Sequence, residues 1–458
     1  MKVSIILAAG EGTRMKSKIP KVLHKVCGKP ILEYVIDASI GAQVQKNVVI
    51  VGHGGDEVRD YFKGKGLIFE NQPIGQGAPY GTGFAVMQGL KHVDDESTVV
   101  ILCGDTPLIR KETINRLFAY HNEGNYSCTV LTAILDDPTG YGRIIRDEVG
   151  NISKIVEDKD ATEEERQVRE INAGIYCFTG KMLKQGLSKI DDDNAQGEFY
   201  LTDAVEILKN EGYNVGAYVI EDPVETHGIN NRVQLAFSEK VMRQRINEFH
   251  MLNGVTIINP ETTYIEDGVI IGRDTIIYPN TYLEGATTIG EDCEIRSNTR
   301  IVDSRIGDGV CIESSLIEES SVGDGTKIGP NAHLRPKSNL GKNIKIGNFV
   351  EVKNSTLGDN AKAGHLAYIG DAFIGKNTNI GCGVIFANYN GKDKQITKVG
   401  DHVFIGSNSN LVAPVNIHDW AYIAAGSTIT KDVEEASLSI ARAEQVNKLN
   451  WVDKKGLR

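Results

Sequence analysis

Residues 265–301 read IEDGVIIGRDTIIYPNTYLEGATTIGEDCEIRSNTRI, and an aliphatic side chain recurs at every sixth position of this stretch. A second run with the same period covers residues 399–429. A period of six fits neither an α-helix nor an alternating β-strand. It is typical of a parallel β-helix built from hexapeptides, in which each strand forms one side of a triangular coil. The fold of nearly half the chain therefore follows from this one pattern.

The ladder also predicts which residues form the interior and which form the corners. Each ladder residue should point inward and stack on the ladder residue one coil below, about 18 residues earlier. Glycine often follows the aliphatic residue, as in Ile271-Gly272, and glycine suits a tight corner at which φ is positive. A polar, turn-forming break lies between residues 386 and 399. A loop must leave the prism there, and such loops commonly carry binding residues, although a plain surface insertion is the alternative.

Composition and charge exclude several classes of protein. The net charge is -11 and is spread along the 458 residues, which argues against nucleic acid as the main partner. The 7 cysteines are scattered without a CxxC motif, so we expect reduced, buried thiols. The N-terminal apolar run is too short for a signal peptide, and no stretch approaches the roughly 18 apolar residues of a membrane span. A cytoplasmic protein without stable membrane insertion is the default expectation.

The chain divides into three segments. In residues 1–231, short aliphatic runs at 3–7, 48–51 and 99–102 alternate with helical stretches, which favours a parallel sheet with helices on both faces. Residues 232–252 carry an apolar stripe at helical spacing and form a linking helix. Residues 253–458 contain the ladder and a polar tail in which Trp451 is the one large anchor. We therefore predict an α/β protein with a Rossmann-like domain, a linking helix and a left-handed parallel β-helix.

Two features of the first segment point to phosphate chemistry. The glycine-rich turn AAGEGTRM at 8–15 follows the first apolar run, and backbone N–H groups of such turns approach phosphates closely. Arg14 and Lys21 add the fixed positive charge that phosphate transfer needs. Asp105 follows the run 99–102, at the edge where open α/β sheets bind ligands, and is a candidate Mg²⁺ ligand. The alternatives are an ordinary turn at 8–15 and a structural cap at Asp105.

A second group of polar residues lies on the ladder. Arg335 and Lys353 are 18 residues apart, which is one coil, so both should lie on one face and could grip a phosphate. His365 follows 12 residues later, on a neighbouring face unless a slip or loop intervenes, and Asn388-Tyr389 lies in the expected loop. This fold recurs in acyltransferases, which makes His365 a candidate catalytic residue; an ordinary surface histidine is the alternative. A partner subunit could complete the site.

Several stretches taken together resemble one family. They are LAAGEGTRM at 7–15, CGDTPL at 103–108, DDPTGYGRI at 136–144, NAQGEFYLTD at 194–203 and GINNR at 228–232. The chain closely resembles, over essentially its whole length, the bacterial bifunctional N-acetylglucosamine-1-phosphate uridyltransferase/glucosamine-1-phosphate acetyltransferase. The resemblance implies acetyl transfer from acetyl-CoA to glucosamine-1-phosphate, then uridylyl transfer from UTP to N-acetylglucosamine-1-phosphate. The product would be UDP-N-acetylglucosamine for cell-wall precursors.

The resemblance implies roles for residues of the first segment. Arg14 would act on the phosphates during transfer, and Asp105 and Asn230 would bind Mg²⁺. The residues that would hold the uridine nucleotide are Leu7, Ala8, Ala9, Gly10, Lys21, Gln76, Gly81 and Thr82. Those that would line the sugar side are Gly142, Glu157, Asn172, Tyr200 and Thr202. Asn230 would also contact the bound UTP or UDP-N-acetylglucosamine. Pro79-Tyr80 and Cys103 depart from the family, which usually has Gln-Leu and Tyr there, so the fine shape of this pocket is open.

The resemblance also implies roles on the ladder. His365 would be the general base that takes a proton from the sugar's 2-amino group as it attacks the acetyl-CoA thioester. The residues that would bind glucosamine-1-phosphate are Arg335, Lys353, Tyr368, Asn379 and Lys394. The residues that would contact acetyl-CoA are Cys382, Asn388, Tyr389, Ser407, Ala425 and Arg442. Cys382 replaces the alanine that is usual in the family. Family members form trimers with acetyl sites between prisms, so a homotrimer is implied.

Two other functions fit the same architecture. A single-function sugar-nucleotide pyrophosphorylase with a regulatory β-helix would not require His365 together with Arg335 and Lys353. A nucleotide-exchange or scaffold subunit could lose Arg14 or Asp105. All of these residues are present, so the bifunctional enzyme is favoured.

Overall fold

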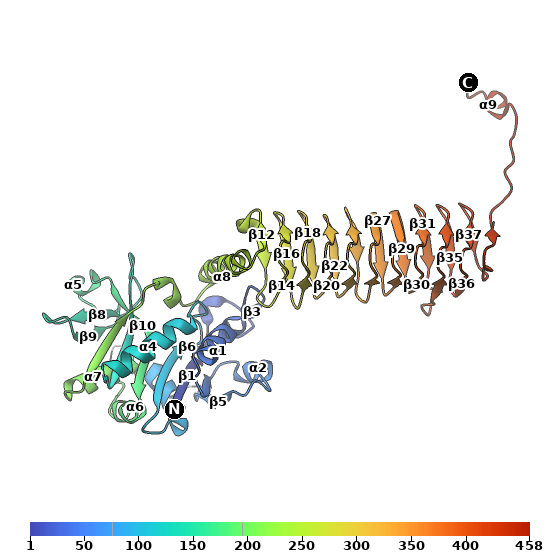
Figure 1. The fold of residues 1–458 in the computed structure, drawn as a ribbon. Coiled ribbons are helices and arrows are strands. Elements are labelled where there is room, and N and C mark those ends of the chain that lie inside the picture. Colours follow the sequence, from blue (N-terminus) through green and yellow to red (C-terminus); the bar gives the residue numbers. More distant parts are fainter. Residues whose placement is uncertain (76, 195) are drawn as a thin grey trace. The chain divides into compact units, whose positions relative to one another are not determined.

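The structure is a computed structural model that describes residues 1–75, 77–194 and 196–458. The described residues form two compact units, Met1–Met242 and Arg243–Arg458. Figure 1 shows helices and a sheet in the first unit and regular strand coils in the second. Across the described ranges, no helix combines the length and the apolar character that a bilayer crossing requires.

The first unit is built on one mixed sheet with the strand order β11-β7-β10-β6-β1-β4-β5. The strands are β1 (Lys2–Ala8), β4 (Lys46–Val51), β5 (Ile68–Asn71), β6 (Thr98–Cys103), β7 (Cys128–Ile134), β10 (Glu170–Thr179) and β11 (Val215–Val219). The predicted runs are the parallel strands β1, β4 and β6. The prediction of a parallel sheet is wrong for β10, which runs antiparallel to β6 and β7. β10 also pairs with β8 (Arg143–Arg146) of the β8–β9 (Ile152–Val156) hairpin, and antiparallel neighbours need no crossover helix.

Helices cover both faces of this sheet, as predicted. α1 (Ile31–Gly41) and α4 (Lys111–Glu123) pack into one core. α3 (Thr82–Met87), α6 (Gly180–Leu187) and α7 (Leu201–Asn210) pack into the other. Successive residues of β6 enter opposite cores: Val100 faces the first core and Val99 and Ile101 the second. The remaining short helices are α2 (Gly55–Tyr61) and α5 (Glu163–Arg166). Because β1 and β6 are parallel neighbours, the loops that follow them leave the same edge of the sheet.

The predicted linking helix is α8 (Arg232–Leu252). Its first turn follows Asn231, whose carbonyl oxygen accepts from the Leu235 N–H at 3.0 Å. The second unit begins within α8 and continues as stacked short strands, from β12 (Thr256–Ile257) to β39 (Leu438–Ser439). All of its strand pairs are parallel, in the described residues, apart from an isolated bridge between Tyr389 and Lys394.

The ladder residues form the interior of the coils, as predicted. Ile277, Ile295 and Ile312 lie in register on successive coils, and each is 0% exposed. The strands that matter for the site are β27 (Lys345–Lys353), β29 (Lys362–Gly370), β31 (Asn379–Ile380), β32 (Ile385–Ala387), β33 (Thr397–Val399), β34 (Phe404–Ile405) and β35 (Asn410–Val412). β27 and β29 are longer than the others and continue through a corner without interruption.

Most corners are turned by other residues than predicted. Of the glycines that follow a ladder residue, Gly329 has the expected positive φ (108°), whereas others such as Gly272 and Gly347 do not have a positive φ. A Cβ atom at Gly272 would instead lie 2.5 Å from the carbonyl carbon of Gly290 on the next coil, so glycine is needed there for close approach of the coils. Positive φ falls on corner residues such as Asn298 (60°) and Asn331 (56°). Asparagine tolerates this left-handed conformation, which explains its use at corners.

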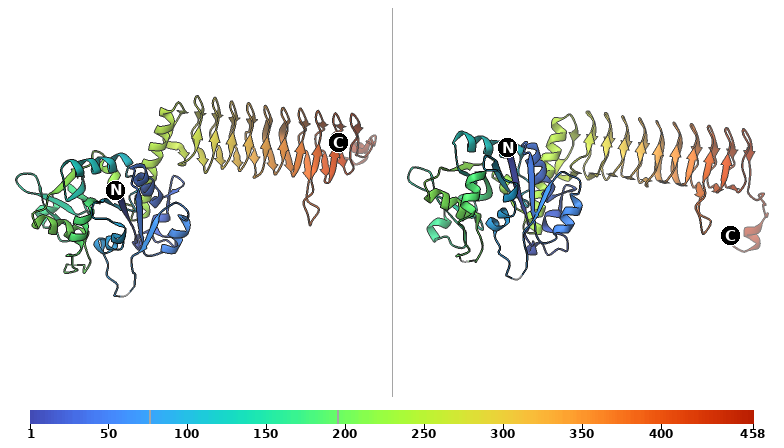
Figure 2. Two further views of the ribbon diagram at one scale, coloured as in Figure 1. Left: turned by 60° about the horizontal axis from the view of Figure 1, so that its bottom comes forward. Right: turned by 90° about the horizontal axis from the view of Figure 1, so that it is seen from below.

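The polar break is a loop, and two other expectations are wrong. The loop leaves the coils between β32 and β33 and projects from them in both views of Figure 2. Cys382 is exposed, whereas buried cysteines were expected, because it lies at a corner rather than on the ladder. Trp451, at the start of α9 (Trp451–Lys454), is 47% exposed, so it does not anchor the tail within this chain.

Candidate functional sites

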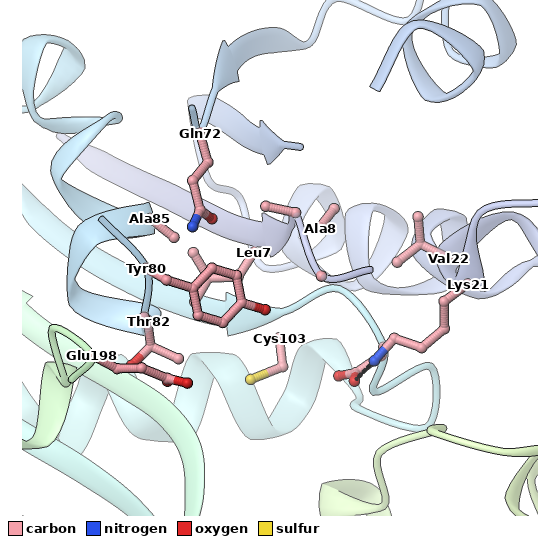
Figure 3. Close-up of a pocket in the computed structure, with 14 residues that line it drawn as sticks. Leu7, Ala8, Lys21, Val22, Gln72, Tyr80, Thr82, Ala85, Cys103 and Glu198 are labelled. Atoms are coloured by element: carbon pink, nitrogen blue, oxygen red, sulfur yellow. Dashed lines mark hydrogen bonds and ion pairs between the residues drawn. The ribbon is translucent and has the colours of Figure 1, made fainter. Parts of the chain in front are cut away.

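Three adjoining cavities open at the edge of the first sheet where β1 and β6 end. Their volumes are about 300, 320 and 240 Å³. Cys103, the last residue of β6, lines all three, so the cavities share a wall. In Figure 3, Tyr80 and Glu198 lie on one side of the first cavity and Lys21 on the other, with Cys103 between them.

A charged cluster lies between the first and second cavities. Lys21 Nζ is 2.5 Å from Asp105 Oδ2 and donates to Asn230 Oδ1 at 3.2 Å. Arg14 donates to the same oxygen of Asn230 at 3.0 Å. The side chains of Lys21 and Asp105 are only 13% and 22% exposed, so water screens their charges weakly. Residues from three loops thus bring two cations, a carboxylate and an amide oxygen to one point.

The oxygens of this cluster fit a magnesium ion. Mg²⁺ is usually held by one or two protein oxygens together with substrate phosphates and water. Asp105 and Asn230 provide two such oxygens, and the Lys21 ammonium already lies within reach of both, so the position suits a cation. Within the described ranges, no group of three or more His, Cys, Asp or Glu side chains could hold a metal. A metal bound here would therefore depend on phosphate oxygens from the substrate.

The first cavity contains most of the predicted nucleotide residues. These are Leu7, Ala8, Ala9, Gly10, Lys21, Gly81 and Thr82. Gly81 has a φ of 121°, and a Cβ atom there would lie 2.4 Å from the carbonyl oxygen of Phe199, so only glycine fits. The hydroxyl oxygen of Thr82 accepts from the Leu201 N–H at 3.1 Å, which ties this wall to α7. Gln76 lies outside the described residues.

The third cavity contains predicted sugar-side residues. They are Gly142, Glu157, Asn172 and Thr202. Burial raises the pKa of Glu157, and the charges of Asp160 and Asp158 act in the same direction. The Asn172 amide donates to the Tyr176 hydroxyl at 2.7 Å and accepts from the Gly174 N–H at 3.0 Å, so its orientation is fixed. Burial raises the pKa of nearby Tyr200 to about 12. These polar groups can hydrogen-bond the hydroxyls of a sugar.

Sequence reasoning missed several residues of these cavities. Gln72 and Glu198 line the first cavity, and Tyr141 and Gln234 line the second. Gln72 is a buried polar side chain in a loop, where no periodicity marks it. Gln234 does carry a signal, because it follows Asn231 at the spacing of a helix-capping box.

His365 and three of the predicted acetyl-CoA residues occupy one corner of the second unit on successive coils. The four are His365, Cys382, Ser407 and Ala425, and all are exposed. The residue after each has positive φ, and backbone hydrogen bonds join these corners from coil to coil. Neighbouring coils are about 4.8 Å apart, so the four side chains form a column. Arg442 extends it, since a Cβ atom at Gly426 would lie 4.0 Å from Arg442 Cδ.

A cluster of cations lies at the far end of the face that begins at His365. The Arg335 N–H donates to the Val352 carbonyl at 2.8 Å, so Arg335 and Lys353 lie in register on successive coils. The side chain of Lys394, from the loop, lowers the pKa of Lys353, as do partial burial and Arg335. This places the two ammonium groups beside each other. A dianionic phosphate would relieve their repulsion.

The loop is anchored by Asn388 rather than by Tyr389. Asn388 is 7% exposed, and its amide donates to Asp371 Oδ2 at 2.5 Å and to the Tyr368 hydroxyl at 3.4 Å. The other oxygen of Asp371 accepts from Asn354 at 2.5 Å. Tyr389 is 61% exposed. Of the predicted pair, Asn388 therefore positions the loop and Tyr389 is available to a ligand.

Asn379 lies on a different side of the triangular coil from the other residues that are predicted to bind glucosamine-1-phosphate. It pairs with Lys362 on the strand that enters the corner. Tyr368 pairs with Ile385 on the strand that leaves the corner. A single chain therefore divides the predicted glucosamine-1-phosphate residues between two faces.

Comparisons with known proteins cover both units. The MobA-like NTP transferase domain family matches residues 4–165. The GMPPB C-terminal domain family matches residues 316–406, and the six-repeat bacterial transferase hexapeptide family matches 268–303 and 396–431. Each match coincides with the unit whose geometry suits it: the α/β sheet in the first case and the coils in the others.

Curated relatives match the chain from end to end. Bifunctional protein GlmU of Clostridioides difficile is 54% identical over 452 residues, which covers 99% of this chain and 97% of the relative. The protein of the same name from Alkaliphilus oremlandii is 55% identical over 454 residues, covering 99% and 98%. That from Listeria monocytogenes is 51% identical over 451 residues, covering 98% of each. The chain therefore belongs to the GlmU family, the bifunctional family that its sequence motifs resemble.

Proposed function

We propose that this chain makes UDP-N-acetylglucosamine with two separate active sites. The second unit acetylates glucosamine-1-phosphate with acetyl-CoA, and the first unit joins the product to the uridylyl group of UTP. Membership of the GlmU family over 99% of the chain supports both activities. The observation that carries the proposal is the presence of both the Lys21–Asp105–Asn230 cluster and the exposed column that begins at His365.

In the first unit the reaction is a displacement at the α-phosphorus of UTP. A phosphate oxygen of the sugar phosphate attacks this phosphorus, the bond to the bridging oxygen of the β-phosphate breaks, and pyrophosphate leaves. Because the nucleophile is already an anion, no strong base is needed, and alignment and charge neutralisation provide the rate. Arg14 and Lys21 supply positive charge at the phosphates. Asp105 and Asn230 would hold Mg²⁺, which would neutralise phosphate charge when bound.

In the second unit the reaction is acyl transfer to an amine. His365 removes a proton as the 2-amino nitrogen attacks the thioester carbonyl carbon, the C–S bond breaks, and coenzyme A leaves. A histidine suits this step because its ordinary pKa is near the working pH. Arg335, Lys353 and Lys394 hold the sugar's phosphate by charge-assisted hydrogen bonds. The exposed residues above His365, from Cys382 to Arg442, provide a track for the coenzyme.

We propose that the working enzyme is a homotrimer in the cytoplasm. Asn379 and Tyr368 lie on different strands of one coil, so a neighbouring prism that brings its own Asn379 against Tyr368 would complete the sugar site. UTP and acetyl-CoA are both cytoplasmic metabolites, which supports the location. Sedimentation would test the trimer.

The two half-reactions can be separated by a pair of variants. His365→Ala should lower acetyl transfer by about 10²- to 10⁴-fold and leave uridylyl transfer intact. Asp105→Ala should do the reverse. His418→Ala and Asp136→Ala alter exposed residues of the same types and units and serve as matched controls. Near-normal acetylation by the His365 variant would show that the assigned base is wrong.

A further inference from the structure

Gln234, in the first turn of α8, holds the residue that completes the charged cluster. Its side-chain oxygen accepts from the Asn230 N–H at 2.8 Å. Asn230 Oδ1 is in turn the acceptor for Arg14 and Lys21. Gln234 is half-buried and lines the second cavity. It therefore stands one residue away from the groups that face the substrate phosphates.

The hydrogen bonds around Gln234 are those of a capping box shifted by one residue. Asn231 caps α8, because its side-chain oxygen accepts from the Gln234 N–H at 2.9 Å. In an ordinary capping box, the glutamine would accept from the N–H of the cap residue itself. Here it accepts from the N–H of Asn230, which precedes the cap. The bond that usually serves only the helix end thus fixes a residue of the site.

A second hydrogen bond also fixes the segment that carries Asn230. The neighbouring Ile229 N–H donates to the backbone oxygen of Asp105 at 2.9 Å. The segment that carries Asn230 is therefore held from two sides, by Asp105 through Ile229 and by α8 through Gln234. Removal of the Gln234 oxygen would leave the Asn230 N–H without this acceptor and would allow its side chain to leave the position opposite Asp105.

We propose that Gln234 is a positioning residue for uridylyl transfer, which sets the place of the Asn230 oxygen for a divalent cation. The proposal rests on the proposed function, in which Asp105 and Asn230 hold Mg²⁺. A residue that orients a metal ligand typically contributes about 10- to 100-fold to metal affinity or activity. The role makes the start of the linking helix part of the first active site.

The test compares full-length variants by metal binding as well as by rate. Gln234→Met removes the acceptor oxygen but keeps side-chain length, and Gln234→Glu retains an acceptor. Asn231→Ala removes the helix cap while leaving the bond from Gln234 to Asn230. Binding of Mn²⁺ in the presence of UDP-N-acetylglucosamine is followed by electron paramagnetic resonance, and uridylyl transfer is measured against Mg²⁺ concentration. Acetyl transfer and the melting temperature report on folding.

Gln234→Met should raise the Mn²⁺ dissociation constant and the half-maximal Mg²⁺ concentration by about tenfold. Gln234→Glu should bind the metal as tightly as the wild type or more tightly, and Asn231→Ala should lower only the melting temperature. Equal weakening in Gln234→Met and Asn231→Ala would overturn the proposal, since helix capping would then explain the effect. Asn230→Ala serves as the variant that removes the proposed metal ligand itself. If Gln234→Met binds Mn²⁺ as the wild type does and Asn230→Ala does not, the positioning role of Gln234 is refuted and the proposed function still stands. Wild-type binding by Asn230→Ala would refute the metal ligand itself.

Discussion

Asp203, in the first turn of α7, should make the stability of the first unit depend on pH. Burial raises its pKa from 3.8 to about 6, and the charges of Glu206, Asp191 and Glu157 act in the same direction. A carboxyl group with a raised pKa holds its proton more tightly in the folded chain than in the unfolded chain. Between pH 3.8 and about 6, folding therefore takes up protons, so the contribution of Asp203 to stability falls as the pH rises through this window.

Replacement of Asp203 by Asn removes the charge and should stabilise the unit above pH 6. A shift of about 2 pKa units corresponds to about 3 kcal/mol at most, at about 1.4 kcal/mol per unit. The loss of a negative charge from the first turn of α7 offsets up to about 1 kcal/mol of this gain. The net gain in the free energy of unfolding should be about 1–2 kcal/mol at pH 8 and close to zero at pH 4, where both side chains are neutral. For a unit of this size, that gain raises the melting temperature by about 2–8 °C.

Calorimetry of the full-length chain from pH 4 to pH 8 measures this gain. Both tryptophans, Trp420 and Trp451, lie in the second unit. A calorimetric transition that does not change the tryptophan fluorescence therefore belongs to the unfolding of the first unit. Asp136→Asn changes a carboxylate that is 99% exposed and should leave the pH profile unchanged. A gain of equal size at pH 4 and pH 8, or a loss at pH 8, would refute the reasoning.

Three further outcomes follow from the site geometry. Lys353→Met should raise the KM for glucosamine-1-phosphate by about tenfold or more, because one charge-assisted hydrogen bond is lost. It should not lower the melting temperature, because the repulsion from Lys394 is removed. Steady-state kinetics measures the first effect and calorimetry the second. Gly81→Ala should destabilise the first unit by more than about 1 kcal/mol, since the residue has positive φ and its new Cβ would meet the Phe199 carbonyl; denaturant unfolding measures the loss. Alkylation of the exposed Cys382 with a bulky maleimide should block acetyl transfer but not uridylyl transfer, and Cys382→Ala should make the enzyme resistant.

Two members of the charged cluster of the first unit, Lys21 and Asp105, could be predicted from the residues themselves because of how parallel strands are arranged, whereas Asn230 was implied only by the family resemblance. Lys21, Asp105 and Asn230 are far apart in the chain, yet two of them follow strands whose carboxyl ends lie at one edge of a sheet. Gln234 could not be placed in the same way. Its role depends on one hydrogen bond to the residue before the helix cap, and the same spacing also fits an ordinary capping box. Periodicity reports which side of an element is buried, but it does not report a single contact.

The errors have a similar physical origin. The parallel sheet that is predicted for residues 1–231 fails at β10, because the composition of a strand does not reveal that it runs antiparallel to its neighbour. Gly272 was expected to turn a corner because glycine often has positive φ. Its actual role is set by the backbone of the next coil at Gly290, which is distant in sequence and therefore invisible to a local pattern.

The second unit separates the residues that stabilise it from those that its corners expose. Ladder residues such as Ile295 are fully buried and carry the packing, whereas corner residues such as His365 and Ser407 are exposed and contribute little to it. The loop that begins at Asn388 leaves β32 in register with β35, so its insertion does not disturb the stacking of the coils. Because every coil presents its corner at the same place, a substitution at one corner changes the column of side chains without changing the interior. The proposed base and the proposed coenzyme track could therefore be assembled one coil at a time on a core that stays constant.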